Sequence, residues 1–166
     1  MANMDNKYTI PVSNEVALFV AIMFSIFSFV GTIANLCTII ALWRSKLRKQ
    51  AMTKFILSLA MCDFLVCCLV FPPTAQQHTI ENIEYPPIIH DMCPYFRYLE
   101  CSLFSISMLH LTAISINRYL LICQQEVYDK IYCSRNVSIM ISGIWLFCFG
   151  FGLLPLFGIW GQIGKL

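Results

Sequence analysis

The residues best suited to chemistry lie in one apolar segment near the middle of the chain, at about residues 93–123. Its polar stripe is formed by residues that are 7, 4 and 7 positions apart: Glu100, Ser107, Leu111 and Arg118. In an α-helix these spacings keep the four side chains on one narrow face. A helix that faced only lipid would not carry an acid, a hydroxyl and a guanidinium there. We therefore expect the stripe to face the inside of a helix bundle.

The same segment is long enough to cross a membrane. Cys93 and Arg118 are 25 residues apart, which corresponds to about 37 Å of α-helix. The hydrocarbon core of a bilayer is about 30 Å thick. We therefore expect these two residues at opposite membrane surfaces.

Two further ionisable residues lie inside apolar segments. Asp63 is near the middle of the second one, and a carboxylate there must be protonated, paired, or held in a wet cavity with a cation. It therefore marks either a polar or ion site that changes state, or a neutral aspartate that is hydrogen-bonded for packing. His110 lies near the centre of the third segment, where a neutral, hydrogen-bonded structural role is favoured over a place in a functional polar network.

Composition indicates that lipid is the natural solvent of these segments. Of the 166 residues, 58% are hydrophobic and 12% are charged, against about 25% charged in an ordinary soluble domain. The apolar runs are too long for strands and do not alternate with period two, so the expected fold is an all-α membrane protein with four transmembrane helices. We place these helices at about residues 16–43, 53–71, 93–123 and 137–161, the second stopped by Pro72 and Pro73.

The charges of the connections predict how the bundle is oriented. The first connection is rich in cations and has no acid: it carries Arg44, Lys46, Arg48, Lys49 and Lys54. The second has only acids: Glu81, Glu84 and Asp91. Because cytoplasmic loops carry the excess of Lys and Arg, the first and third connections should be cytoplasmic and the N-terminus extracellular. Cys93 is then outside and Arg118 inside, and the first segment is expected to be a retained signal-anchor rather than a cleaved signal peptide.

Several classes of function are disfavoured. The net charge is only +2, and no basic block is interleaved with aromatic residues, so no nucleic-acid partner is expected. Most of the nine cysteines lie in apolar runs and no paired CxxC occurs, so no zinc site is expected. No nucleophile–base pair stands at a workable spacing, so the chain is not expected to be an enzyme.

The order and spacing of several short motifs resemble the rhodopsin-like (class A) G protein-coupled receptors along essentially the whole chain. The matching positions are Asn35 in the first helix, Leu59-Ala60-Met61-Cys62-Asp63 in the second, Cys93 and Asn117-Arg118-Tyr119 at the two ends of the third, Trp145 and Pro155 in the fourth, and Lys46-Leu47-Arg48 in the first cytoplasmic loop. Within this class, residues 116–122 and 157–161 resemble the insect moody and trapped-in-endoderm receptors, a group similar to melatonin receptors. The chain would then be the N-terminal part of a seven-helix bundle, with residues 1–15 extracellular, 16–161 in the partial receptor domain and 162–166 starting the second extracellular loop.

The resemblance implies a role for each matching residue. Asn117, Arg118 and Tyr119 would form the motif that couples to a heterotrimeric G protein. Asn35, Asp63 and Ser107 would line a cavity for a sodium ion, which acts as an allosteric ligand and is the only cofactor expected. Cys93 would form a disulfide with a cysteine of the second extracellular loop, and Trp145 and Pro155 would pack the fourth helix.

The ligand pocket is the least defined part of the resemblance. Its candidates are Glu100 and Phe104, of which Glu100 occupies the position where aminergic receptors carry an aspartate that pairs with a ligand ammonium. The relatives that this chain resembles throughout are not expected to be amine receptors, so pairing of Glu100 with Arg97 or with a later helix is an equal alternative. The extracellular ligand is unknown.

The sequence departs from the family in two places. Asn117 stands where the family has an acid beside the arginine, so it can hydrogen-bond the guanidinium but adds no charge. Gln125 stands where many relatives have proline, although Tyr128 matches the tyrosine that follows.

Three functions stay open at this stage. We favour a plasma-membrane receptor of which this chain is a fragment, unable to catalyse nucleotide exchange alone because the sixth helix is missing. The alternative is a truncated partner that regulates a full-length receptor, for example by retaining it in the endoplasmic reticulum through helix pairing in an oligomer. A small transporter or channel subunit, with Asp63 and Glu100 in an ion path, leaves the Asn-Arg-Tyr match unexplained.

Overall fold

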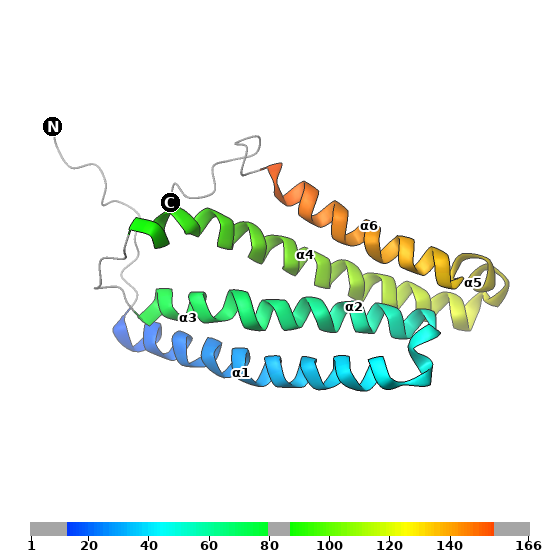
Figure 1. The fold of residues 1–166 in the computed structure, drawn as a ribbon, viewed down its shortest axis with the longest axis horizontal. Coiled ribbons are helices and arrows are strands. Elements are labelled where there is room, and N and C mark those ends of the chain that lie inside the picture. Colours follow the sequence, from blue (N-terminus) through cyan, green and yellow to red (C-terminus); the bar gives the residue numbers. More distant parts are fainter. Residues whose placement is uncertain (1–12, 80–86, 155–166) are drawn as a thin grey trace.

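The computed structural model describes residues 13–79 and 87–154, and within these ranges every regular element is a helix (Figure 1). The long helices are α1 (Asn14–Arg44), α2 (Ala51–Leu65), α4 (Pro87–Cys123) and α6 (Ser134–Gly152), and the short ones are η1 (Lys46–Lys49), η2 (Val66–Val70), α3 (Phe71–Thr79) and α5 (Gln125–Ile131). Four helical stretches are long and apolar enough to cross a membrane: Asn14–Arg44, Ala51–Ala75, Pro94–Cys123 and Ser134–Gly152. The expected four-span, all-α membrane fold is therefore confirmed.

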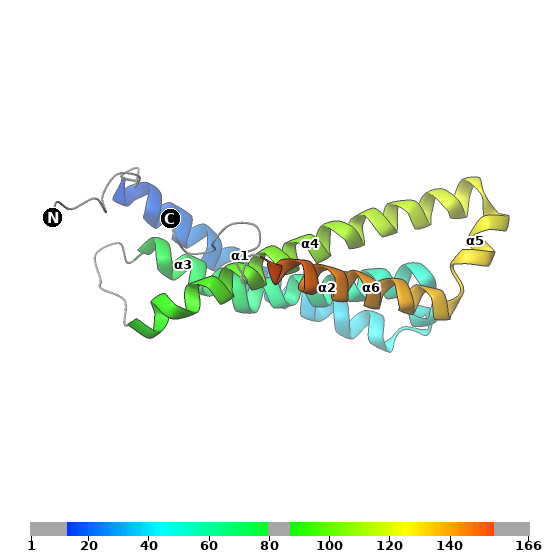
Figure 2. The ribbon, with the colours of Figure 1, turned by 90° about the horizontal axis from the view of Figure 1, so that it is seen from above.

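The helices run antiparallel in chain order, which gathers the first and third connections at one end of the molecule. Figures 1 and 2 both place the turn after α1 and the short helix α5 at this end, opposite the start of α1. Ser45 shapes the first turn, because its Oγ accepts a hydrogen bond from the backbone N–H of Leu47, 3.0 Å away, at the start of η1. The basic residues of both connections therefore share one surface.

Helix α4 is the central packing element. It packs against α2, α5 and α6, whereas α1 packs mainly on α2 and α3. The first apolar cluster, around the middle of the bundle, is built on Cys62, Val70, Leu103, Ile106 and Cys148. The second, near α5, is built on Ala51, Phe55, Tyr132 and Val137. Both clusters join α2 to α6, and the residues packed on them include several of α4.

The second span does not stop at Pro72 and Pro73, so that prediction is wrong. Its helix widens into a π-helical turn, η2, and continues as α3 to Thr79. Proline lacks an N–H and therefore leaves a carbonyl of the preceding turn without its donor. Ser28 of α1 supplies a donor in that turn, because its Oγ lies 2.7 Å from the Cys67 carbonyl oxygen. The π-turn and a serine from the neighbouring helix together let the helix pass through two prolines.

The other helix ends lie close to their expected positions, with one exception. Helix α1 covers 14–44 instead of 16–43, and α6 begins at 134 instead of 137, while its expected end at 161 lies outside the described residues. The exception is α4, which begins at Pro87 instead of residue 93. Proline is favoured in the first helical turn, where its missing N–H needs no partner. Helix α4 therefore extends beyond the apolar part that defined it in the sequence.

Glycine at position 31 allows α1 to approach η2 closely. A Cβ atom at Gly31 would collide with the sulfur of Cys67, which is itself buried. A Cβ at Gly150 of α6 would meet nothing within 4 Å.

We predict that Gly31→Ala destabilises the bundle, whereas Gly150→Ala does not. Overpacking costs about 1–3 kcal/mol, while alanine at an open helical position gains up to about 1 kcal/mol of helix propensity. Thermal unfolding of the two purified variants in detergent measures the difference. Equal melting temperatures for both variants would contradict the close approach of α1 and η2.

Candidate functional site

A hydrogen bond between α2 and α4 forms the centre of the site. The Ser107 hydroxyl donates to Oδ1 of Asp63 over 2.8 Å, and both residues are half-buried. Next to them, the Cys62 thiol donates to the Leu103 carbonyl over 3.2 Å. The intramembrane acid is therefore paired with a hydroxyl of the facing helix, as a polar group in lipid requires.

Asn35 lies on α1 and does not join this pair. Its Nδ2 donates to the Gly31 carbonyl of its own helix over 3.0 Å. Within the described part of the chain, no hydrogen bond links Asn35 to Asp63. Of the three residues expected around a sodium cavity, the structure joins two by a hydrogen bond, and the third bonds its own helix.

Trp145 fixes α6 to α2. Its indole Nε1 donates to the Ser58 hydroxyl over 2.9 Å, and the indole ring packs against Phe149 at a centroid distance of 5.8 Å. Ser58 is buried, at 8% exposure. Pro155, the other residue expected to pack this helix, lies outside the described residues. Sequence reasoning missed Ser58, because a serine in an apolar run carries no signal until its partner is known.

The Asn-Arg-Tyr motif divides between two faces of α4. Asn117 is fully buried, at 0% exposure, whereas Arg118 and Tyr119 are exposed. Successive residues of a helix point about 100° apart, so the Asn117 amide does not reach the guanidinium. Neither polar atom of that amide has a hydrogen-bond partner among the described residues. The hydrogen bond that Asn117 could form with the Arg118 guanidinium is therefore not formed among the described residues.

An aromatic cluster packs beside the motif. The Phe55 ring is fully buried and lies edge-on to His110 and Tyr132, with centroid distances of 6.3 Å and 6.4 Å. His110 donates from Nδ1 to the Ile106 carbonyl over 2.8 Å, which fits its expected structural role. Tyr128 of α5 stacks on Tyr132 at 5.1 Å. Burial raises the pKa of Tyr132 above its ordinary value, so this phenol is neutral at cellular pH.

The stripe predicted on α4 lies at the edge of the packed face, not at its centre. Ser107 is half-buried, while Leu111 and Arg118 are exposed. The most deeply buried α4 residues lie on the adjacent face: Ser102, Leu103, Ile106, His110 and Asn117. Helical spacing placed the stripe residues on one face correctly, but it did not show how that face is rotated toward α2 and α6.

At the other end of α4, Glu100 is paired within its own helix. Arg97 Nη1 lies 2.8 Å from Glu100 Oε2, and the two side chains are 57% and 38% exposed. Phe104, the other pocket candidate, is exposed. Cys93 lies in the same helix, four positions before Arg97 in the sequence, and its side chain is outside the described residues. The alternative in which Glu100 pairs with Arg97 is therefore the one observed.

We predict that Ser107→Ala destabilises the bundle more than Ser105→Ala does. Ser107 bonds Asp63 across two helices, whereas exposed Ser105 bonds only the Cys101 carbonyl of its own helix, over 2.8 Å. Leaving a half-buried acid without its donor costs about 1–3 kcal/mol, and the loss at Ser105 should stay below about 0.5 kcal/mol. Thermal unfolding in detergent compares them, and equal losses would contradict the interhelical role.

Comparison with known proteins finds similarity to seven-transmembrane receptors over most of the chain. Residues 34–165 match the family described as 7 transmembrane receptor (rhodopsin family). The G-protein coupled receptor moody of Drosophila pseudoobscura pseudoobscura is 31% identical over 152 residues, which cover 92% of this chain and 22% of that protein. Protein trapped in endoderm-1 of Drosophila melanogaster is 31% identical over 152 residues, covering 91% of this chain and 38% of the relative.

A third relative corrects one expectation. D(2) dopamine receptor A of Xenopus laevis is 31% identical over 140 residues, which cover 84% of this chain and 31% of that receptor. The expectation that relatives along the whole chain exclude amine receptors is therefore wrong.

The chain spans well under half the length of each of these three relatives. The match nevertheless includes all four described spans in whole or in part. The chain therefore belongs to the rhodopsin family of seven-transmembrane receptors, and its spans correspond to the first four helices of that bundle.

Proposed function

We propose that these four helices are part of a plasma-membrane receptor that passes an extracellular signal to a heterotrimeric G protein. The observation that carries the proposal is that Arg118 is exposed, at the end of α4 where the resemblance implies the G protein coupling motif. Family membership supports the receptor class, and the G protein is the partner expected from it.

The proposed orientation puts Arg118 in the cytosol. One end of the bundle holds the first connection and α5 (Figure 1). Among the described residues, the cationic side chains at this end are Arg44, Lys46, Lys49, Lys54, Arg118, Lys130 and Arg135. Its acids are Glu126 and Asp129. Since cationic ends stay on the cytoplasmic side, this asymmetry supports an extracellular N-terminus.

The inactive state of such a receptor would lack one of the family's restraints. Arg118 forms no ion pair among the described residues, and Asn117 provides no charge beside it. An arginine without a neighbouring acid meets an incoming partner without first breaking a local ion pair. We therefore propose that less energy separates the inactive and active arrangements here than in relatives with an acidic neighbour.

A sodium ion near Asp63 fits part of the donor set. Asp63 and Ser107 together present oxygen ligands, which hard cations prefer, in a half-buried position. Asn35 is held by its own helix and does not contribute a contact to the pair. We propose that Asp63 and Ser107 would hold the ion, which would supply a positive charge between α2 and α4 and favour the arrangement in which these helices stay together.

The outer end of α4 would form one wall of the ligand site. The Arg97–Glu100 pair and exposed Phe104 present a charged and an aromatic surface there. Cys93 would anchor the second extracellular loop above them through a disulfide. An ammonium ligand would have to displace Arg97 from Glu100, so the pair itself would select against weakly binding amines.

A matched pair of arginine variants on α4 tests coupling. The complete chain is fused to helices five to seven of the moody receptor, and basal nucleotide exchange on a heterotrimeric G protein is measured in membranes. Arg118→Gln should reduce exchange about tenfold or more, because a desolvated charge contact at an interface is worth at least about 2 kcal/mol. Arg97→Gln, at the opposite end of the same helix, should leave it within about twofold. Equal effects of the two changes would contradict the role of Arg118.

Sodium dependence is tested by thermal unfolding of the chain in sodium chloride against choline chloride at equal ionic strength. A sodium concentration of about ten times the dissociation constant should stabilise the chain by about 1.4 kcal/mol. Asp63→Asn should abolish the difference, whereas Asp129→Asn, an exposed acid on α5, should keep it. The same sodium effect in both variants would show that the ion binds elsewhere or only screens charge.

A further inference from the structure

The short helix α5 cannot be ordered by its own residues. It contains seven residues, and isolated helices shorter than about 12 residues are marginal in water. None of its residues is buried, and the side chain of Gln124 at its N-cap forms no capping hydrogen bond. Contacts with the rest of the bundle must therefore hold α5 in its position.

Tyr132, the residue that follows α5, provides such a contact. Its backbone N–H donates to the Tyr128 carbonyl over 2.8 Å, which closes the last turn of α5. The residue is only 7% exposed and lies in the second apolar cluster with Ala51 and Phe55 of α2 and Val137 of α6. Tyr132 therefore joins α5 to two of the spans.

The aromatic rings around Tyr132 form a row that runs from the core to α5. Phe55 is fully buried and lies edge-on to His110 of α4 and to Tyr132, with centroid distances of 6.3 Å and 6.4 Å. Tyr128 of α5 stacks on Tyr132, with centroids 5.1 Å apart and ring planes 16° apart. Each aromatic pair is worth about two- to tenfold in an equilibrium constant beyond its burial. The two pairs that Tyr132 forms therefore fix α5 relative to α2.

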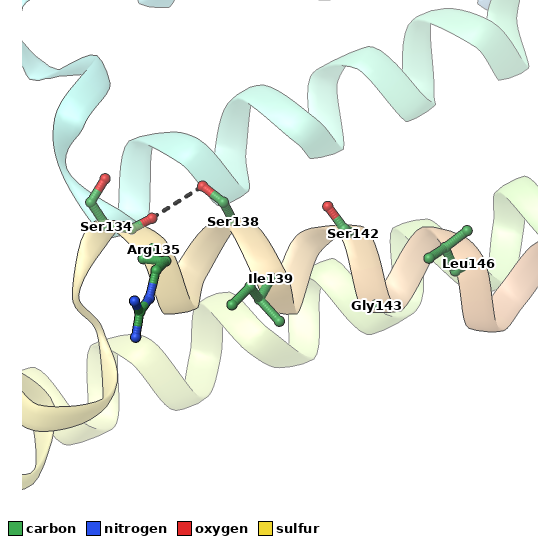
Figure 3. Close-up of a pocket in the computed structure, with 7 residues that line it drawn as sticks. All are labelled: Ser134, Arg135, Ser138, Ile139, Ser142, Gly143 and Leu146. Carbon is green, nitrogen blue, oxygen red and sulfur yellow. Dashed lines mark hydrogen bonds between the residues drawn. The ribbon is translucent and has the colours of Figure 1, made fainter.

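The chain that follows Tyr132 is also fixed to α2. Lys54 donates from Nζ to the carbonyl and to the hydroxyl of Ser134, the first residue of α6, over 3.0 Å and 2.6 Å. The Ser138 hydroxyl donates to the same carbonyl over 3.1 Å (Figure 3). Tyr132 therefore lies between a helix start that is bonded to α2 and a short helix that depends on Tyr132 itself.

The position of α5 matters because this helix lies at the end of the bundle where α4 ends (Figures 1 and 2). It begins seven positions after Arg118. Val127 and Ile131 are one helical turn apart on α5 and are 38% and 40% exposed. Tyr128, which belongs to the row of rings, points about 100° away from Val127 around the helix. Packing of the two tyrosines therefore leaves Val127 and Ile131 on a free surface at the Arg118 end.

We propose that Tyr132 is a positioning residue for G protein coupling. By packing against Phe55 it holds α5 so that Val127 and Ile131 join Arg118 in one surface for the G protein. The inference rests on the proposed receptor function, which supplies the partner. A receptor in which α5 is not held still folds, but only the fraction of molecules with α5 in place binds the partner, and the apparent affinity falls by that fraction.

The test uses the fusion to helices five to seven of the moody receptor and measures nucleotide exchange in membranes against G protein concentration. Tyr132→Leu keeps an apolar side chain but removes both ring pairs. The half-maximal concentration should therefore rise about fivefold or more, while the maximal rate stays within about twofold. A mere loss of folded receptor would lower the maximal rate instead.

Two variants serve as controls. Tyr132→Phe keeps the ring, and Tyr95→Leu removes a ring that is 58% exposed near the opposite end of α4. Both should leave the half-maximal concentration within about twofold of the unmodified fusion. An unchanged value in Tyr132→Leu, or an equal rise in Tyr95→Leu, would overturn the role in coupling.

Hydrogen exchange of the complete chain in detergent, without a G protein, tests the placement of α5 separately. In Tyr132→Leu the backbone amides of residues 125–131 should exchange about fivefold faster or more, and in Tyr132→Phe at the unmodified rate. Unchanged exchange in Tyr132→Leu would overturn the inference even if the fusion couples. A fusion without any nucleotide exchange would contradict the proposed receptor function, and hydrogen exchange would still decide whether Tyr132 holds α5.

Discussion

A bilayer offers no water to polar groups, so each polar atom inside it needs a partner from the protein itself. This constraint explains the main contacts of the bundle. Oδ1 of Asp63 accepts a hydrogen bond from Ser107 of the facing helix, and the Trp145 indole donates one to Ser58. Each bond joins two spans that gain little from the hydrophobic effect when they associate, because lipid tails are as apolar as the side chains that they would replace.

The same constraint governs the backbone. The prolines of the second span lack the backbone N–H groups that a helix needs as hydrogen-bond donors. A π-turn forms next to them, and the Ser28 hydroxyl of the neighbouring helix donates to a carbonyl of that turn. Close approach at Gly31 makes that contact possible. The π-turn η2 is therefore a joint property of two helices, and α1 supports the second span although most of its own surface is exposed in this structure.

Sequence reasoning predicted what depends on local pattern. Apolar runs predicted the four spans, and the family resemblance predicted that Asp63 and Ser107 lie together. It did not predict contacts between residues that are far apart in the sequence. The helix through Pro72 depends on Ser28, and the position of Lys54 depends on serines that are 80 and 84 residues further along. Helical periodicity also leaves the rotation of a helix undetermined, so the burial of Asn117 and the exposure of Arg118 became visible only in the packed bundle.

We propose that α4 crosses the membrane with its Arg118 end in the cytosol and its Arg97 end outside. Two single-cysteine variants test this most directly in intact cells with a membrane-impermeant maleimide, one keeping exposed Cys133 and the other carrying Tyr95→Cys at an exposed position. The account predicts that Tyr95→Cys is labelled in intact cells, and that Cys133 is labelled only after permeabilisation. Labelling of both positions from the same side would contradict it.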